Sequence, residues 1–199
     1  MKSKLAIIAL IVGIVALVGV GVATVAPNVM AGNGNAHGKT QVVEFDVAED
    51  MNRFIFDQDV TFDDGLPADG SSFITRGYLY EAGTLTDSDG VNPDGSPEYP
   101  EKVIGEWICQ GYMINDAGHA TDGVWVFSTQ FFQFSEEPGA ETIVTQGYEL
   151  ADVGVAIQRA ITGGTGEYDN ARGEGSQTLL GLNATEGVNL RVKLEVNQQ

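Results

Sequence analysis

The clearest candidate for a chemical site in this sequence is a glycine cluster near its end. Residues 163–166 read Gly-Gly-Thr-Gly, and Tyr168 follows two positions later. Glycines cradle a phosphate where a strand runs into a helix, because the helix N-terminus then faces the anion. No Gly-Lys-Ser/Thr follows here, and residues 175–182 lack a helical apolar period. The cluster therefore predicts a tight turn between two strands rather than a nucleotide site, with glycines taking positive φ.

Thiol and imidazole groups are scarce. The chain has one cysteine, Cys109, so it has no internal disulfide, and a lone buried cysteine usually behaves as a small apolar residue. The two histidines, His37 and His119, form no metal-ligand spacing with each other or with Cys109. We therefore expect neither a structural metal nor a metal cofactor.

Acidic side chains gather in residues 82–102, which read as a long polar loop. Carboxylates at such spacing could bind calcium. An EF-hand loop counted from Asp87, however, would place Val91 and Asn92 at the positions that need an oxygen ligand and a glycine. A solvated loop is the default prediction, and a weak calcium site stays the alternative.

The first residues indicate export. Two lysines precede an uncharged apolar run, and small residues before Gly32 suit cleavage. Residues 1–31 are thus predicted to be a signal peptide, or a retained N-terminal anchor, since about 20 apolar residues can span a bilayer. Residues 32–39 read as a flexible tether, and residues 40–199 as one domain. The predicted location is secreted or extracytoplasmic.

The charge balance limits the partners. The sequence carries 28 acidic and 10 basic residues, a net charge of −18. Such a surface repels nucleic acid and anionic lipid. We expect no nucleic-acid partner, and membrane contact only through the N-terminal segment.

Almost everything after residue 40 reads as strand and turn. Residues 188–196 alternate apolar and charged or polar side chains, which gives one inward and one outward face. Residues 49–53 read as a short helical turn. An eight-stranded antiparallel barrel, wide enough for side chains or one small ligand, is the predicted all-β fold. The candidate strands are residues 40–48, 53–62, 72–81, 103–113, 124–134, 141–149, 153–162, 174–183 and 187–196.

Two of these strands, 103–113 and 124–134, carry apolar residues on both faces. A strand buried on one side only does not need this pattern, so we expect their outer faces to be covered. A homo-oligomer is the favoured explanation.

The order Gly-Gly-Thr-Gly-x-Tyr-x-x-Ala-Arg-Gly-Glu, at 163–174, resembles the signature of the dirigent and allene oxide cyclase-like barrels. Supporting blocks between residues 103 and 196 follow the order of bacterial members. The resemblance implies an eight-stranded, commonly trimeric barrel with an apolar cavity. Such proteins cyclise an unsaturated fatty-acid epoxide or steer phenolic intermediates, without metal or redox cofactor.

The resemblance also nominates catalytic residues. Cys109 lies where the cyclases place a cavity cysteine, Asp46 where dirigents carry an early-strand aspartate, and Arg172 matches the motif arginine. Asp46, or Glu44 beside it, would then act as acid or base, with a pKa raised by an apolar barrel. Arg172 would anchor an anionic group of the substrate. A salt bridge from Arg172 that fixes the hairpin, and an outward, solvated Asp46, are the competing interpretations.

Trp107, Cys109 and Met113 share one face of a predicted strand, because side chains two and four positions apart point the same way. We expect this face to line the barrel, with Tyr168 and Glu44 as further ligand-binding candidates. The predicted partner is a small apolar or aromatic molecule. Three functions stay open: an exported cyclase or isomerase, a non-catalytic binder, and a structural surface protein.

Overall fold

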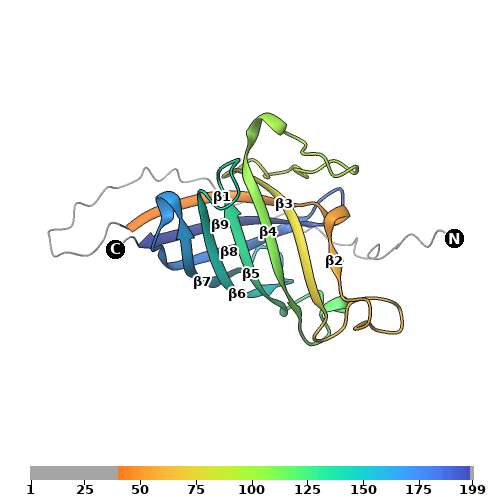
Figure 1. Ribbon diagram of the computed structural model, residues 1–199. Helices are drawn as coiled ribbons and strands as arrows, with labels where there is room; N and C mark the ends of the chain where they lie inside the picture. Colours follow the sequence, from red (N-terminus) through yellow and green to blue (C-terminus); the bar gives the residue numbers. More distant parts are fainter. Residues whose placement is uncertain (1–39, 198–199) are drawn as a thin grey trace, which may run out of the picture. The chain divides into compact units, whose positions relative to one another are not determined.

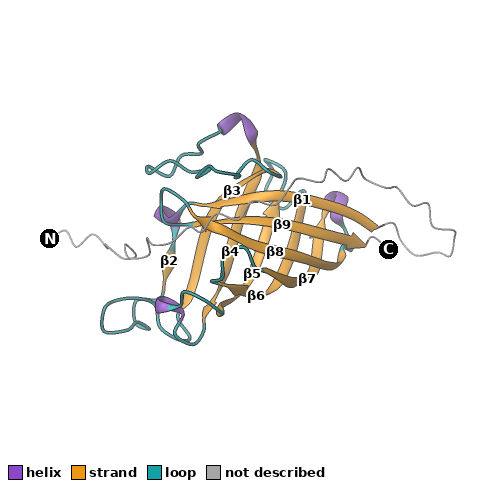
Figure 2. Ribbon diagram, turned by 180° about the vertical axis from the view of Figure 1, so that it is seen from behind, coloured by secondary structure: helices purple, strands orange, loops and turns teal. Residues whose placement is uncertain are grey.

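The computed structural model describes residues 40–197, and the predicted signal and tether segments lie outside this range. Nine strands and four short 3-10 turns make up the described chain, which contains no α-helix (Figures 1 and 2). None of its helical turns has the length or the apolar character to cross a membrane. The strands are β1 (Thr40–Glu49), β2 (Ile55–Phe56), β3 (Ser72–Glu81), β4 (Val103–Met113), β5 (Val124–Gln133), β6 (Thr142–Leu150), β7 (Ala156–Thr165), β8 (Arg172–Leu182) and β9 (Val188–Asn197).

Eight of the strands close into an antiparallel barrel. From β3 to β9 each strand pairs with the next, and β1 pairs with β9 on one side and with β3 on the other. The β1–β9 ladder runs from Thr40–Asn197 to Ala48–Asn189, whereas the β1–β3 ladder covers only residues 45–49 of β1. The predicted eight-stranded barrel is confirmed.

The early chain departs from the expected pattern. The predicted helical turn at 49–53 is present as η1 (Met51–Arg53), where the Asp50 side chain accepts a hydrogen bond from the Asn52 amide. The predicted strand 53–62 is wrong for most of its length: β2 has only two residues and pairs with the start of β3. Beyond it the chain forms turns, because Asp57 and Asp64 bond to amides two residues ahead.

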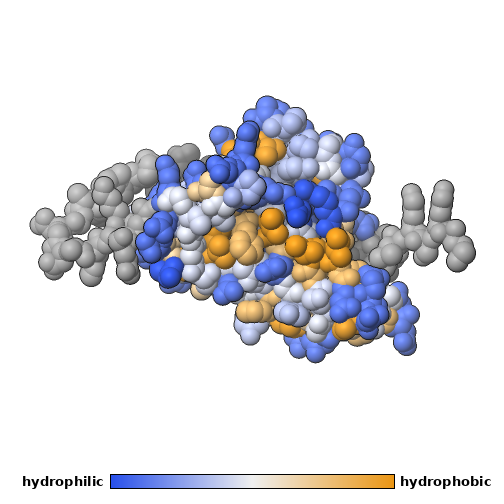
Figure 3. Space-filling view, in the orientation of Figure 1, coloured by the Kyte–Doolittle hydropathy of each residue, from blue (hydrophilic) through white to orange (hydrophobic). Residues whose placement is uncertain are grey.

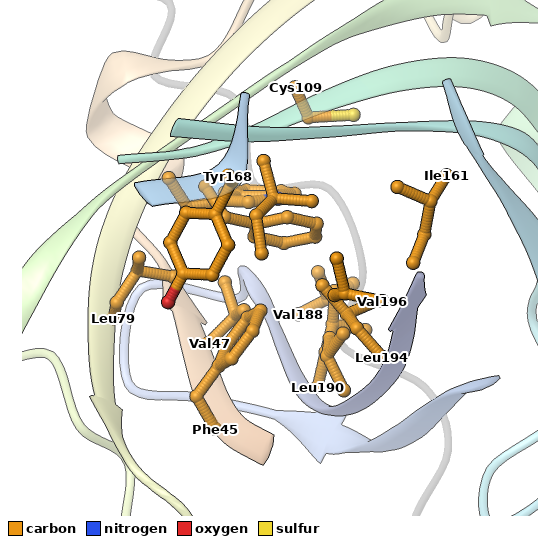
Figure 4. Packing of buried hydrophobic residues seen from close by; sticks show 14 of the residues in the cluster. Phe45, Val47, Leu79, Cys109, Ile161, Tyr168, Val188, Leu190, Leu194 and Val196 are labelled. Carbon is orange, nitrogen blue, oxygen red and sulfur yellow. The ribbon is translucent and has the colours of Figure 1, made fainter. Parts of the chain in front are cut away.

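The barrel interior is largely apolar at the end where β7 meets β8. Phe45 lies with its ring centroid 4.8 Å from that of Phe132 and 5.5 Å from that of Phe134. The Tyr168 ring packs against Phe134 at 5.6 Å. Figure 4 shows labelled side chains of β1 and β9 pointing into the barrel interior, where Tyr168 is also buried. These packed rings fill this end of the barrel.

The glycine cluster shapes that end. A Cβ at Gly164 would overlap with the Tyr168 carbonyl and lie 2.8 Å from the Thr142 carbonyl oxygen, and Gly166 has a φ of +61°. Both positions therefore favour glycine. The chain turns through η4 (Gly166–Tyr168) and buries Tyr168, which confirms the predicted tight turn.

A second, smaller apolar cluster lies outside the barrel wall, under the loop that joins β3 to β4. Ala48, Tyr80, Leu85 and Val91 form it, and the Tyr80 hydroxyl donates a hydrogen bond to the Gly90 carbonyl. The loop is thus anchored to the outer face of β1 and β3. In the described chain, its acidic residues do not converge into a metal-binding group.

Candidate functional site

Charged and polar side chains occupy the interior of the barrel at the end where β4, β6 and β8 finish. They come from inward positions of five neighbouring strands, and each residue is nearly fully buried. We call this set the interior polar cluster: Cys109 on β4, Ser128 on β5, Glu149 on β6, Arg159 on β7 and Gln177 on β8.

An ion pair lies at the centre of the cluster. Arg159 Nη1 is 3.7 Å from Glu149 Oε1, and the two side chains are only 2% and 7% exposed. Burying either charge alone would be costly, so each partner makes the other tolerable. The pair places balanced charge among the other polar side chains of this cluster.

Arg159 is fixed by hydrogen bonds in addition to the ion pair. Its Nη2 donates to the Ser128 carbonyl and hydroxyl, both at 3.0 Å, and its Nη1 donates to the Tyr148 carbonyl at 3.0 Å. Its Nε reaches the Thr145 hydroxyl at 3.3 Å. A Cβ at Gly147 would lie 3.3 Å from Arg159 Cγ, so the glycine leaves room for the arginine stem. The guanidinium is therefore held in one position.

Glu149 receives several donors. Gln177 Nε2 donates to Oε2 at 2.9 Å, and the Ser128 hydroxyl donates to Oε1 by a short hydrogen bond. The Cys109 thiol donates to the same oxygen at 3.5 Å. Burial and the nearby Glu149 charge raise the pKa of the Cys109 thiol well above its usual value, so the thiol stays protonated and unreactive.

A second interior carboxylate comes from the end of β1. Glu49 Oε1 accepts from the Thr75 hydroxyl at 2.6 Å, and Oε2 accepts from the Val188 amide at 2.9 Å. Burial, aided by the charge of Glu149, raises the pKa of Glu49 from 4.5 to about 7. A carboxyl group with this pKa can both give and take a proton near neutral pH.

The face of β4 that carries Trp107, Cys109 and Met113 points into the barrel, as the sequence predicts. Trp107 and Cys109 are 1% and 2% exposed and belong to the barrel core, and the half-buried Met113 packs against it. The expectation that this face lines the interior and buries Cys109 is confirmed. Tyr168 is also buried, at the opposite, aromatic end of the barrel.

Asp46 does not enter the interior, which corrects the expected placement. It alternates with the inward Phe45 and Val47 and lies on the outer face of β1, fully buried beneath the β3–β4 loop. Its carboxylate accepts from the amides of Gly83 at 2.8 Å and Leu85 at 3.0 Å. Arg191 Nε donates to it at 2.9 Å, so the cationic partner of Asp46 is Arg191. Asp46 therefore fixes the β3–β4 loop to β1, and we call Asp46 with its donors Gly83, Leu85 and Arg191 the clasp around Asp46.

Arg172 and Glu44 also lie outside the barrel. Both are exposed, and the Arg172 guanidinium donates to the carbonyl of Ala171 at 2.6 Å. Arg172 is the first residue of β8, directly after the turn that follows the glycine cluster. Its side chain is exposed and directed away from the interior. The structure therefore brings neither residue together with Cys109.

The residues at the centre of the cluster were not among the sequence candidates. Arg159 stands between Ile157 and Ile161, two residues to either side, and so shares their inward face. A charged residue at an inward position between two isoleucines was the signal in the sequence that could have identified Arg159 as an interior residue. Its partner Glu149 could not be paired with it from sequence, because the register of β6 shifts by one residue against β7.

The sequence matches no protein-family model and no curated protein. Solved structures do match. The pterocarpan synthase dirigent protein PsPTS1 is 16% identical, with 82% of this chain and 98% of that chain covered and a TM-score of 0.59. The pterocarpan synthase dirigent protein GePTS1 is 15% identical, with 88% and 96% covered and a TM-score of 0.51. This chain has the dirigent barrel fold. An exo-specific intermolecular Diels-Alderase, AbnU, matches with 15% identity, 79% and 98% coverage and a TM-score of 0.46.

In this dirigent-type barrel a surface hollow of about 480 Å³ lies on the wall formed by β7, β8 and β9. It is lined mainly by outward residues, among them Gln158, Glu174 and Glu195. The hollow opens on the outer side of the barrel wall, whereas the interior polar cluster lies inside it. Arg159 is the one residue that the two have in common.

Proposed function

We propose that this protein takes a small apolar molecule into its barrel and steers the cyclisation or isomerisation of that molecule. The observation that carries the proposal is Glu49, a buried carboxyl group with a pKa of about 7 in the same interior as the Arg159–Glu149 pair. Acid–base catalysis is most effective when the pKa of the catalytic group lies near the working pH.

The apolar walls would supply the second contribution. A flexible substrate held between aromatic and aliphatic side chains has fewer conformations, and restricting it to a reactive one lowers the entropic part of the barrier. The fold shared with two pterocarpan synthase dirigent proteins supports a role with small molecules.

The site of action in this proposal is outside the cytoplasm. The predicted signal peptide or anchor in residues 1–31 and the net charge of −18 support export. An acidic surface keeps such a protein soluble in a salty exterior, where counterions screen its self-repulsion.

Self-association is part of the proposal. Tyr112, Phe127 and Tyr148 are direct cross-strand neighbours on the outside of β4, β5 and β6, and they are 56%, 43% and 52% exposed. We call these three residues the outer aromatic row. Figure 3 shows hydrophobic residues gathered across this side of the barrel. We propose that a second and a third copy cover it in a trimer.

The experiment uses a reaction with a chiral outcome. A 2′-hydroxychalcone, whose hydroxyl is ortho to the ketone, closes to a flavanone when its phenol oxygen adds to the β-carbon of the enone and the phenol proton is transferred to the α-carbon. This reaction proceeds slowly without help and gives a racemate. We expect the wild-type protein to accelerate it and to give an excess of one enantiomer, and Glu49→Gln to abolish both effects. A racemate at the spontaneous rate with wild-type protein would refute steering of this substrate class.

A structural role is the second candidate. Large side chains such as Trp107, Phe45 and Phe132 are almost fully buried and fill much of the interior. A barrel that serves only as a scaffold would bind none of the small molecules tested and would tolerate Glu49→Gln without functional loss.

A further inference from the structure

Three polar side chains in the barrel interior have hydrogen-bonding atoms without a partner among the described residues: Gln177, at its Oε1, and the neighbours Gln130 and Trp107. Gln130 on β5 is 0% exposed, and neither its Oε1 nor its Nε2 is bonded. The indole Nε1 of Trp107 on β4 is likewise unbonded, with the residue 1% exposed. Cys109 pairs directly with Gln130 across the two strands, and Trp107 lies one inward position further along β4.

Such groups are costly to bury. An unsatisfied buried donor or acceptor costs about 1–3 kcal/mol, and most buried polar atoms in proteins are paired. On β5 the inward neighbours of Gln130 are Phe132 on one side and Ser128 on the other, so the amide lies where the apolar part of the interior meets the interior polar cluster. An amide kept there without a protein partner is suited to bind something that enters the barrel.

The charges of the interior indicate what kind of molecule can enter. Among residues 40–197, Arg159 is the one cationic residue that is buried, and Glu149 lies 3.7 Å from it. The guanidinium also donates to Ser128, Thr145 and the Tyr148 carbonyl. With Glu49 nearby, the interior carries no surplus positive charge, and an incoming anion would lose its hydration without gaining a counterion.

We propose that the barrel binds an uncharged apolar molecule through a carbonyl or hydroxyl oxygen, with Gln130 and Trp107 as its hydrogen-bond partners. The proposal rests on the proposed function and names its ligand class. Trp107 Nε1 and Gln130 Nε2 donate to a carbonyl oxygen, and Gln130 Oε1 accepts from a hydroxyl group. The proposal replaces the expectation of an anionic substrate anchored by Arg172.

The test uses two small molecules of nearly equal shape. Benzylacetone carries a neutral ketone, and hydrocinnamate carries a carboxylate in place of its acetyl group. Calorimetric titration of the full barrel near pH 7.5 should show benzylacetone binding at least about tenfold more tightly than hydrocinnamate. Gln130→Met and Trp107→Phe should each weaken benzylacetone binding about five- to tenfold, as the loss of one hydrogen bond does. Gln146→Met, on the exposed outer face of β6, is the control and should leave binding unchanged.

A second measurement separates the roles of Gln130. If the amide serves a ligand and has no partner in the free protein, Gln130→Met should make the free protein more stable, with an unfolding constant at least about fivefold smaller. The indole N–H resonance of Trp107, assigned with Trp107→Phe, should shift when benzylacetone is added.

Each outcome bears on a different statement. If benzylacetone binds the wild type and Gln130→Met equally well, or hydrocinnamate binds as tightly as the ketone, the neutral-oxygen site is refuted while small-molecule binding stands. If neither molecule binds and the Trp107 resonance stays in place, both the site and the proposed binding function fail.

Discussion

Arg159 on β7 and Glu149 on β6 form an ion pair in which both side chains are sealed inside the barrel, with Nη1 3.7 Å from Oε1. The other ion pairs among the described residues include at least one side chain that is a third or more exposed. A single substitution in the Arg159–Glu149 pair therefore leaves an uncompensated charge buried in the barrel interior.

Removing one partner of this pair should be more harmful than removing both. We expect Arg159→Met to lower the free energy of unfolding by about 3–5 kcal/mol, because it leaves Glu149 buried without its cation. The double variant Arg159→Met with Glu149→Leu should recover part of that loss. Urea denaturation of the two single variants and the double variant measures the coupling. Strictly additive effects would show that the two charges do not interact.

Glu49 should make the stability depend on pH in an unusual direction. Its pKa is about 7 in the folded protein and 4.5 when unperturbed, so the folded state holds its proton more tightly than the unfolded state. The contribution of Glu49 is fully present below about pH 4.5, and it is lost as pH rises through 7. The loss amounts to about 3 kcal/mol. Denaturation midpoints measured between pH 5 and pH 8 should fall with pH in the wild type and fall less in Glu49→Gln. Parallel curves for the two proteins would contradict the raised pKa.

The clasp around Asp46 should hold the β3–β4 loop rather than the barrel. Asp46→Asn removes the charge that accepts from Gly83, Leu85 and Arg191, at a cost of about 2–3 kcal/mol. We expect faster proteolysis within residues 82–102, monitored by mass spectrometry, while the circular dichroism of the barrel is unchanged. Glu44→Gln, two residues earlier on the same outer face but exposed, is the matched control. Equal cleavage of all three proteins would show that the loop does not depend on Asp46.

The outer aromatic row should drive self-association. Sedimentation is expected to show a trimer at near-physiological and at high salt, and more strongly at high salt because acidic repulsion is then screened. Phe127→Glu places a charge at the centre of the row and should yield monomers. Leu182→Glu, at a 49% exposed site on β8, should leave the assembly intact. A wild-type monomer under both salt conditions would refute the prediction.

The barrel was predictable from local patterns. Val188, Leu190, Val192 and Leu194 alternate with polar residues, and a period of two needs no tertiary information to assign an inward face. The predicted strand 53–62 is wrong beyond Phe56, because the aromatic residues Phe54 and Phe56 suggest a long strand, whereas their rings pack against each other and Phe54 also packs against Phe73 at 5.7 Å. Asp57 and Asp64 then divert the chain into turns.

The site was less predictable than the fold. The strand alternation that placed Cys109 correctly could not choose a face for Asp46, since residues on both sides of β1 are buried there: Phe45 and Val47 inside, Asp46 and Ala48 beneath the loop. A long-range contact with the β3–β4 loop decided the outcome. The Arg159–Glu149 pair depends on strand register, and the bulge between Val144 and Thr145 shifts that register by an amount that no local pattern encodes.

The pairing of the first strand with the last has a consequence for how the chain acquires its shape. Thr40 and Asn197 are ladder partners and share a hydrogen bond across 157 positions of sequence. Until β9 is available, β1 and β8 are two unprotected sheet edges, and such edges recruit other chains. Contacts this distant in sequence also form slowly. The barrel can therefore close only once residues 188–197 are free to pair, and a chain that lacks this last strand has both edges open.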